Sequence, residues 1–129
     1  QPLTLISRAV PFAKLVSYYQ AADVAWITPL ADGMNLVAKE FIASRVDGDG
    51  VLVLSEFAGA AVELADAVIT NPFSNRAMDL TILSALEMPE IERRQRMKNL
   101  RAAVMETNVR RWVPGTLQLQ TGSKNASAA

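Results

Sequence analysis

The residues best suited to chemistry lie in one short stretch, between a predicted buried strand and the helix that follows it. Asp32 and Gly33 come shortly after an apolar run, and Glu40 lies within the helix. Asp32 can accept hydrogen bonds from sugar hydroxyls, and Glu40 is spaced to accept both hydroxyls of a ribose 2′,3′ pair. The first N–H groups of a helix favour a phosphate or diphosphate. The stretch therefore predicts a nucleotide-sugar site, in which Gly33 permits close backbone approach or a positive φ.

A purely structural interpretation of the same residues stays open. Asp-Gly after a strand is most often only a turn, and a Glu on a helix is usually solvated. The stretch also lacks the glycine spacing of a G-x-G-x-x-G fingerprint or of a P-loop, so neither motif is present in its usual form. Spacing alone thus leaves two interpretations, a nucleotide-sugar site and an ordinary turn.

Composition limits the chemistry further. The 129 residues include no Cys and no His, and 13 basic side chains balance 13 acidic ones. Disulfide scaffolds, thiolate and imidazole metal ligands, Cys nucleophiles and Ser-His-Asp triads are excluded, and we expect neither a metal nor a cofactor. The balanced charge argues against a nucleic-acid partner. No apolar run approaches the ~18 residues of a membrane span, so we expect a cytoplasmic protein without membrane attachment.

The elements that must position this stretch alternate along the chain. Apolar β-branched runs predict strands at residues 3–6, 24–28, 51–55 and 67–70. Apolar spacing predicts helices at 11–22, 35–45 and 90–106, a short one opening at 58–61, and one between a cap at Ser74 or Asn75 and Pro89. In the second helix Val37, Ala38, Phe41 and Ile42 are expected to point inward, and Lys39, Ser44 and Arg45 outward; in the one before Pro89, Met78, Ile82, Ala85 and Leu86 are expected to share the apolar face. The alternation indicates parallel βαβ units, hence an open doubly wound α/β sheet that binds ligands outside the carboxyl ends of its strands.

Three runs of sequence carry a resemblance to a known family. They are Y-Y-Q-A-A-D-V-A-W-I-T-P-L at 18–30, D-G-M-N-L-V-A-K-E at 32–40 and G-V-L-V-L-S-E-F-A-G-A-A at 50–61. Over residues 10–112 the chain closely resembles the trehalose-6-phosphate synthase family of retaining glycosyltransferases. Within it, Trp26 and the run S-E-F-A-G-A-A-V-E-L at 55–64 are most similar to the branch that forms glucosylglycerol phosphate.

The resemblance implies a fold and a set of site residues. The fold is an open Rossmann-like parallel sheet, the latter part of the C-terminal domain of a GT-B glycosyltransferase. Residues 1–112 would form part of a nucleotide-sugar-binding domain, and 113–129 a C-terminal segment with a disordered tail. Asp32 would hold hydroxyls of the donor glucose, and Glu40 would bind the ribose. Main-chain N–H groups would line the glucose and diphosphate from Gly33, Met34, Asn35, Leu36 and Val37, and no residue of this chain is identified as catalytic.

The resemblance also implies a reaction, the transfer of glucose with retention from ADP-glucose to glycerol 3-phosphate for compatible-solute synthesis. Transfer from UDP-glucose, or another nucleoside-diphosphate glucose, to glucose 6-phosphate is the alternative. A non-catalytic α/β binding module is an alternative of another class. The family's glycine-rich loop and acceptor-binding residues have no counterpart in these 129 residues, so we expect the chain to lack an N-terminal domain and to be inactive alone. Ala31 occupies a position at which the family usually has an Arg. A homo-oligomer is also left as an open alternative to a monomer.

Other patterns have simpler explanations. The run D-G-D-G at 47–50 is similar to a calcium loop, but the twelfth position is Ala58, where a bidentate Glu is needed. Residues 90–111 are rich in Arg, but Glu residues interrupt the run and aromatic side chains are missing, which favours a solvated outer helix. We expect Glu56 and Glu63 to have capping or surface roles, although Glu63 can also face the cleft between the two domains of a GT-B fold. We expect Trp112 to anchor the last helix.

Overall fold

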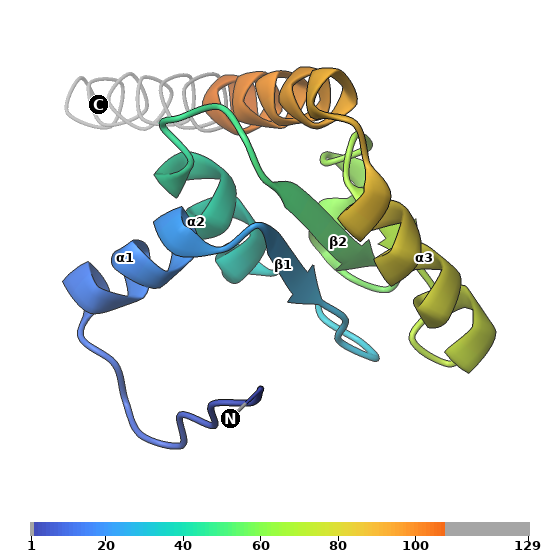
Figure 1. Ribbon diagram of the computed structural model, residues 1–129, viewed down its shortest axis with the longest axis horizontal. Coiled ribbons are helices and arrows are strands. Elements are labelled where there is room, and N and C mark those ends of the chain that lie inside the picture. The colour runs from blue at the N-terminus through green and yellow to red at the C-terminus, as the bar shows by residue number, and fades with distance from the viewer. Residues whose placement is uncertain (1, 108–129) are drawn as a thin grey trace, which may run out of the picture.

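Short apolar runs form strands and amphipathic segments form helices, in the alternating order that the sequence predicts (Figure 1). The computed structural model describes residues 2–107; the predicted segment 113–129 and Trp112 lie outside the described residues. The elements are α1 (Phe12–Ala21), β1 (Val24–Ile27), α2 (Leu36–Ser44), β2 (Val51–Ser55), the 3₁₀ helix η1 (Gly59–Val62), β3 (Val68–Thr70) and α3 (Asn75–Glu87). A further helix begins at residue 90 and includes the described residues up to 107.

The sheet has three parallel strands in the order β1-β2-β3. Ala25 of β1 pairs with Leu52 of β2, and Leu54 of β2 pairs with Ile69 of β3. Every residue of the central strand β2 is buried, which explains why its first four residues are continuously apolar rather than alternating. Because the strands are parallel, their carboxyl ends meet at one edge of the sheet, the edge at which the sequence predicts the site.

The predicted strand at residues 3–6 is wrong for the part of the chain that the structure describes. These residues take no regular secondary structure, and Leu3 and Leu5 are exposed. In Figure 1 the segment lies apart from the helices and the sheet. A β-strand needs a neighbour to receive its backbone hydrogen bonds, and none of the strands in the described ladder pairs with this segment. An apolar, β-branched composition therefore was not sufficient to form a strand here.

Helices cover both faces of the sheet. α2 and the 90–107 helix pack on one face, where Leu52 and Leu54 of β2 point, and α3 packs on the other, where Val51 and Val53 point. The first face holds the larger cluster of buried side chains: Ala38, Phe41, Ile42, Leu52, Leu54, Ala58, Ala60, Leu64, Ala67, Met97, Leu100 and Val104. None of the helices within residues 2–107 is long and apolar enough to cross a membrane.

Helix α3 begins at the predicted cap and buries the predicted face except at Leu86, with Thr81 added to it. The Ser74 Oγ accepts a hydrogen bond from the Ala77 N–H at 3.1 Å, which satisfies one of the free donors of the first turn. Thr81 and Ala85 are buried, and the Thr81 hydroxyl donates to the Thr70 Oγ1 of β3 at 3.0 Å. Leu86, predicted for the apolar face, is exposed. Packing against β3 therefore selects a stripe that includes a hydroxyl, which hydrophobic spacing alone could not show.

Arg45 is buried, contrary to the outward orientation predicted for it. Its guanidinium Nη1 donates to the carbonyl oxygens of Tyr19, Gln20 and Ala22 at 2.6 to 2.9 Å, and its Nε donates to the carbonyl of Asp49 at 2.7 Å. The last carbonyls of α1 have no partner within their own helix, so a buried guanidinium can satisfy several of them together. Arg45 thereby joins the end of α1 to the turn that precedes β2.

The two carboxylates of the turn at 47–50 pair with arginine side chains. Asp49 accepts two hydrogen bonds from Arg93, at 2.9 and 3.1 Å, and this interaction lowers the pKa of Asp49 to about 2. Asp47 accepts from Arg45 Nη2 at 3.2 Å. No cluster of metal-ligating side chains occurs within residues 2–107. The bidentate Asp49–Arg93 pair holds the start of the 90–107 helix against this turn.

Candidate functional site

The β1–α2 loop, residues 28–35, follows the carboxyl end of β1 and leads into the first turn of α2. In Figure 1 this loop, coloured cyan, projects beyond the tip of the β1 arrow. All the predicted site residues lie in the loop or in α2, so the fold places them at one edge of the sheet. This is the edge where parallel α/β sheets bind ligands.

The Asp32 carboxylate orders its own loop. Its Oδ1 accepts the N–H groups of Met34 and Asn35 at 3.0 and 3.1 Å, and its Oδ2 accepts the Asn35 side-chain amide at 3.0 Å. A carboxylate has about four acceptor positions. Three donors leave it capacity for about one more hydrogen bond, such as that of a sugar hydroxyl. Asp32 is half-buried, so its predicted contact with a ligand remains compatible with this internal role.

Asn35, rather than Gly33, takes the left-handed conformation of the loop. Its φ is 65°, and Gly33 is not among the glycines of the described chain with positive φ. Asn tolerates this region better than most residues because its short polar side chain hydrogen-bonds locally. Here its Oδ1 accepts the Ala38 N–H at 2.9 Å and caps α2, while Asp32 holds its amide nitrogen. The two side chains thus fix the direction from which the chain enters α2.

The predicted N–H donors at residues 33–37 differ in whether the loop itself engages them. The N–H groups of Met34 and Asn35 point to Asp32, so they are engaged within the loop. Leu36 and Val37 are the first two residues of α2, where N–H groups have no acceptor within the helix. The side chains of both residues are exposed, so the inward orientation predicted for Val37 is wrong. These two N–H groups therefore have no partner within their helix, which is the condition for binding an anion at a helix start.

Backbone contacts with residues 57–60 support the β1–α2 loop, a feature that the sequence analysis missed. The Asp32 N–H donates to the Phe57 carbonyl at 3.3 Å, the Gly59 N–H to the Asp32 carbonyl at 2.7 Å, and the Ala60 N–H to the Met34 carbonyl at 3.0 Å. A Cβ on Gly59 would lie 2.1 Å from the Gly33 carbonyl oxygen. The close approach of these two backbone segments therefore requires a glycine at position 59, whereas a Cβ on Gly33 would meet nothing within 4 Å.

Glu40 lies one turn beyond Leu36 on the same face of α2, because residues four apart on a helix are neighbours. It is half-buried, and its Oε2 accepts a hydrogen bond from the Tyr19 hydroxyl at 3.2 Å. The adjacent Lys39 forms an ion pair with Glu63 at 2.8 Å, which ties α2 to the chain after η1. The sequence analysis missed both partners, because neither lies near residues 39 and 40 in the sequence.

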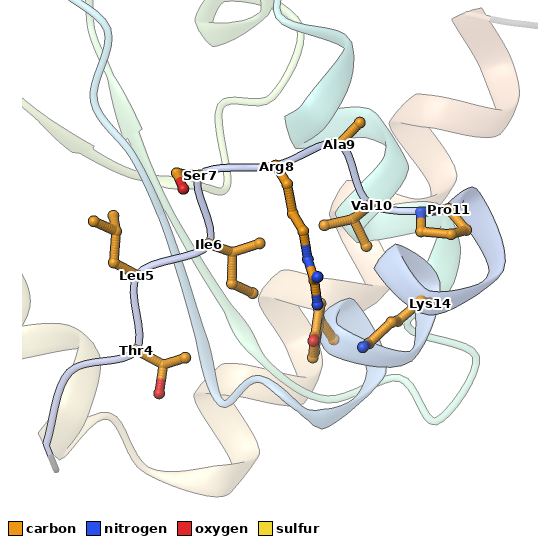
Figure 2. Close-up of a pocket in the computed structure, with 10 residues that line it drawn as sticks. Thr4, Leu5, Ile6, Ser7, Arg8, Ala9, Val10, Pro11 and Lys14 are labelled. Atoms are coloured by element: carbon orange, nitrogen blue, oxygen red, sulfur yellow. The ribbon is translucent and has the colours of Figure 1, made fainter.

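A separate hollow of about 680 Å³ lies between the N-terminal segment and α1. Figure 2 shows the side chains of Arg8 and Lys14 beside it, and the rest of its lining comes from residues 4–11 and Tyr18. None of the predicted site residues lines it. Almost all of its lining residues are exposed, so the hollow holds no buried polar group that a specific ligand requires.

Solved structures share the fold of this chain. The alpha,alpha-trehalose-phosphate synthase (UDP-forming) from Burkholderia xenovorans, solved in complex with glucose-6-phosphate, superposes with a TM-score of 0.81 at 39% identity. The match covers 88% of this chain and 25% of that one. It confirms the predicted fold class, an α/β sheet that forms part of a GT-B glycosyltransferase.

Curated relatives and a family model agree with the structural match. The chain is 49% identical over 111 residues to the glucosylglycerol-phosphate synthase of Picosynechococcus sp., covering 86% of this chain and 22% of that protein. It is 45% identical over 121 residues to the trehalose-6-phosphate synthase of Mycobacterium sp., covering 94% and 25%. The chain thus spans about a quarter or less of the relatives it matches. Because the model for glycosyltransferase family 20 matches residues 1–120, the chain belongs to that family.

Proposed function

We propose that the chain forms the donor-binding part of a longer, retaining glucosyltransferase. The observation that carries the proposal is the first turn of α2, where the N–H groups of Leu36 and Val37 lie on the same helix as Glu40. The two N–H groups bind the diphosphate of a nucleotide sugar, and Glu40 accepts the ribose hydroxyls. Asp32 accepts one glucose hydroxyl with the acceptor position that its own loop leaves free.

The role of α2 in the reaction is to stabilise the leaving group. Breaking the bond between glucose and diphosphate places negative charge on the diphosphate, and the positive end of a helix stabilises that charge. The diphosphate then assists removal of the acceptor proton on the same face of the sugar, which retains the configuration. The side chains assigned here thus bind and orient the donor, and the acceptor is held by residues of a domain outside this chain.

ADP-glucose and glycerol 3-phosphate are the proposed substrates. Three curated relatives named glucosylglycerol-phosphate synthase, 47% to 50% identical, support this acceptor. The phosphorylated product would be the precursor of the compatible solute glucosylglycerol in the cytoplasm. UDP-glucose and glucose 6-phosphate are the second candidate pair. They are supported by relatives named trehalose-6-phosphate synthase and by the UDP-forming structure solved with glucose-6-phosphate.

A crossed assay of the full-length enzyme separates the two pairs. Each donor, ADP-glucose or UDP-glucose, is combined with each acceptor, glycerol 3-phosphate or glucose 6-phosphate. The released nucleoside diphosphate, ADP or UDP, is measured. We expect turnover with glycerol 3-phosphate and with ADP-glucose as the better donor. Turnover with glucose 6-phosphate alone would replace the first pair by the second, and no turnover with any combination would favour a non-catalytic binding module.

Glu40→Gln in the full-length enzyme tests the ribose contact. The substitution keeps the shape of the side chain but removes its charge, and a hydrogen bond to a charged group contributes more than one to a neutral group. We expect the Kd for the nucleotide sugar, measured by calorimetry, to rise roughly tenfold. Glu87→Gln, at the exposed end of α3, is the matched control and should leave the Kd unchanged. A Glu40→Gln variant with the affinity of the wild type would remove Glu40 from the site.

A further inference from the structure

Tyr19 contacts Glu40 although the two residues lie on different helices. Tyr19 belongs to the last turn of α1 and Glu40 to α2, and the Tyr19 hydroxyl lies 3.2 Å from Glu40 Oε2. Both side chains are half-buried, so solvent competes less for this hydrogen bond than at an exposed site. The neighbouring Tyr18 is exposed, and its ring faces the Lys14 ammonium at 5.9 Å instead. The contact with Glu40 is therefore specific to one of two adjacent tyrosines.

Two independent contacts fix the position of Tyr19. Its ring packs edge to face on Phe41, with centroids 6.3 Å apart and planes at 82°. Its main-chain carbonyl accepts a hydrogen bond from the buried guanidinium of Arg45 at 2.9 Å. Because both ends of the residue are held, the hydroxyl cannot follow Glu40 if that side chain rotates. Tyr19 thus provides a fixed point for a carboxylate on a neighbouring helix.

The protonation of this pair suits a donor and an acceptor. Burial raises the pKa of Tyr19 above its ordinary value, and the hydrogen bond to Glu40 raises it further. The phenol therefore keeps its proton at neutral pH and donates it to the carboxylate. One oxygen of Glu40 is then engaged by protein, which leaves the other to accept hydrogen bonds from a ligand.

We propose that Tyr19 is a positioning residue for donor recognition, which holds Glu40 Oε2 so that Oε1 is presented to the ribose hydroxyls. The proposal rests on the ribose role of Glu40 given above. It makes Tyr19 a determinant of selectivity for nucleotides with an intact 2′,3′ diol, although it does not contact the nucleotide itself. A side chain that orients a liganding group typically affects affinity through that group alone, and the test uses this property.

The experiment compares affinities for two pairs of probes in the full-length enzyme. Calorimetry gives the Kd for ADP and UDP, and for their 2′,3′-dideoxy counterparts, in the wild type and in Tyr19→Phe, Tyr18→Phe and Glu40→Gln. Tyr19→Phe removes one oxygen and keeps the ring on Phe41. We expect it to raise the Kd for the better-bound ribonucleotide roughly fivefold while leaving the dideoxynucleotide Kd unchanged. Tyr18→Phe is the matched control and should change neither Kd.

Each outcome assigns the result to one of the two proposals. If Glu40→Gln weakens only ribonucleotide binding but Tyr19→Phe weakens both kinds of nucleotide equally, or neither, the positioning role is overturned and the ribose role stands. If Glu40→Gln instead leaves the ratio of the ribonucleotide Kd to the dideoxynucleotide Kd unchanged, the ribose role itself fails, and the positioning role fails with it. In the double variant Tyr19→Phe/Glu40→Gln, the ribonucleotide Kd should equal that of Glu40→Gln alone, because the carboxylate that Tyr19 positions is already lost. An additive rise in Kd would contradict the proposal.

Discussion

Replacing Gly59 by Ala is expected to displace the β1–α2 loop and to weaken donor binding roughly tenfold or more. The new methyl group would lie 2.1 Å from the Gly33 carbonyl oxygen and 3.2 Å from the Met34 nitrogen. Backbone atoms cannot rotate away as a flexible side chain can, so the two segments must separate. Separation breaks the hydrogen bonds that Gly59 and Ala60 donate to the loop. Asp32 then loses the support that places it beside the first turn of α2.

The measurements are donor affinity of the full-length enzyme and urea denaturation of the same variant. Forcing a methyl group into a close contact typically destabilises a protein by about 1 to 3 kcal/mol. Gly33→Ala is the matched control for folding, because the same methyl group on the opposing segment meets nothing within 4 Å. We expect its free energy of unfolding to stay within about 0.5 kcal/mol of the wild type. If Gly59→Ala leaves both affinity and stability unchanged, residues 57–60 do not support the loop.

Arg45→Met is expected to destabilise the chain by about 3 kcal/mol. Methionine has a similar stem but no donors, so the carbonyls of Tyr19, Gln20, Ala22 and Asp49 would lose the guanidinium that they share. These part-buried carbonyls would lose the partner that satisfies them, and leaving a polar group without a partner away from water typically costs about 1 to 3 kcal/mol. The loss therefore exceeds that of an ordinary surface substitution.

Urea denaturation followed by circular dichroism measures this effect. Arg94→Met is the matched control, because Arg94 is half-exposed: it pairs with Glu90 on its own helix at 2.9 Å, and more weakly with Asp49 at 3.9 Å and the Asp47 carbonyl at 3.2 Å. Such pairs contribute about 0.3 to 0.5 kcal/mol, so the control should shift the midpoint little. Equal destabilisation by the two variants would show that the buried hydrogen bonds of Arg45 contribute no more than an exposed charge.

Hydrophobic pattern was sufficient to predict the elements that are stabilised by local sequence. The apolar run of β2 and the i, i+3, i+4 spacing of α1 and α2 identify their own structure, because a buried strand and an amphipathic helix each have a distinct periodicity. The location of the candidate site follows from the same information. Once β1 is placed in a parallel sheet and α2 follows it along the chain, the residues between them must lie at the carboxyl edge of the sheet.

Features that depend on distant partners could not be predicted in this way. Arg45 looks like an exposed helical residue until the end of α1 is placed beside it. Gly59 lies in a run of small residues that predicts tight packing, but the sequence does not say that its neighbour is the carbonyl of Gly33. Residues 3–6 have the composition of a strand, but composition does not supply a strand to pair with. In each case the missing information is a contact between segments far apart in the sequence.

The central claim is that residues 32–40 hold the nucleotide-sugar donor, and hydrogen exchange of the full-length enzyme tests it most directly. Exchange is measured by mass spectrometry with and without saturating nucleotide sugar. The prediction is slower exchange in peptides that cover 32–40, where the N–H groups of Leu36 and Val37 bind the diphosphate, and unchanged exchange in peptides from α3. Donor binding that leaves residues 32–40 unprotected and slows exchange only elsewhere would contradict the claim.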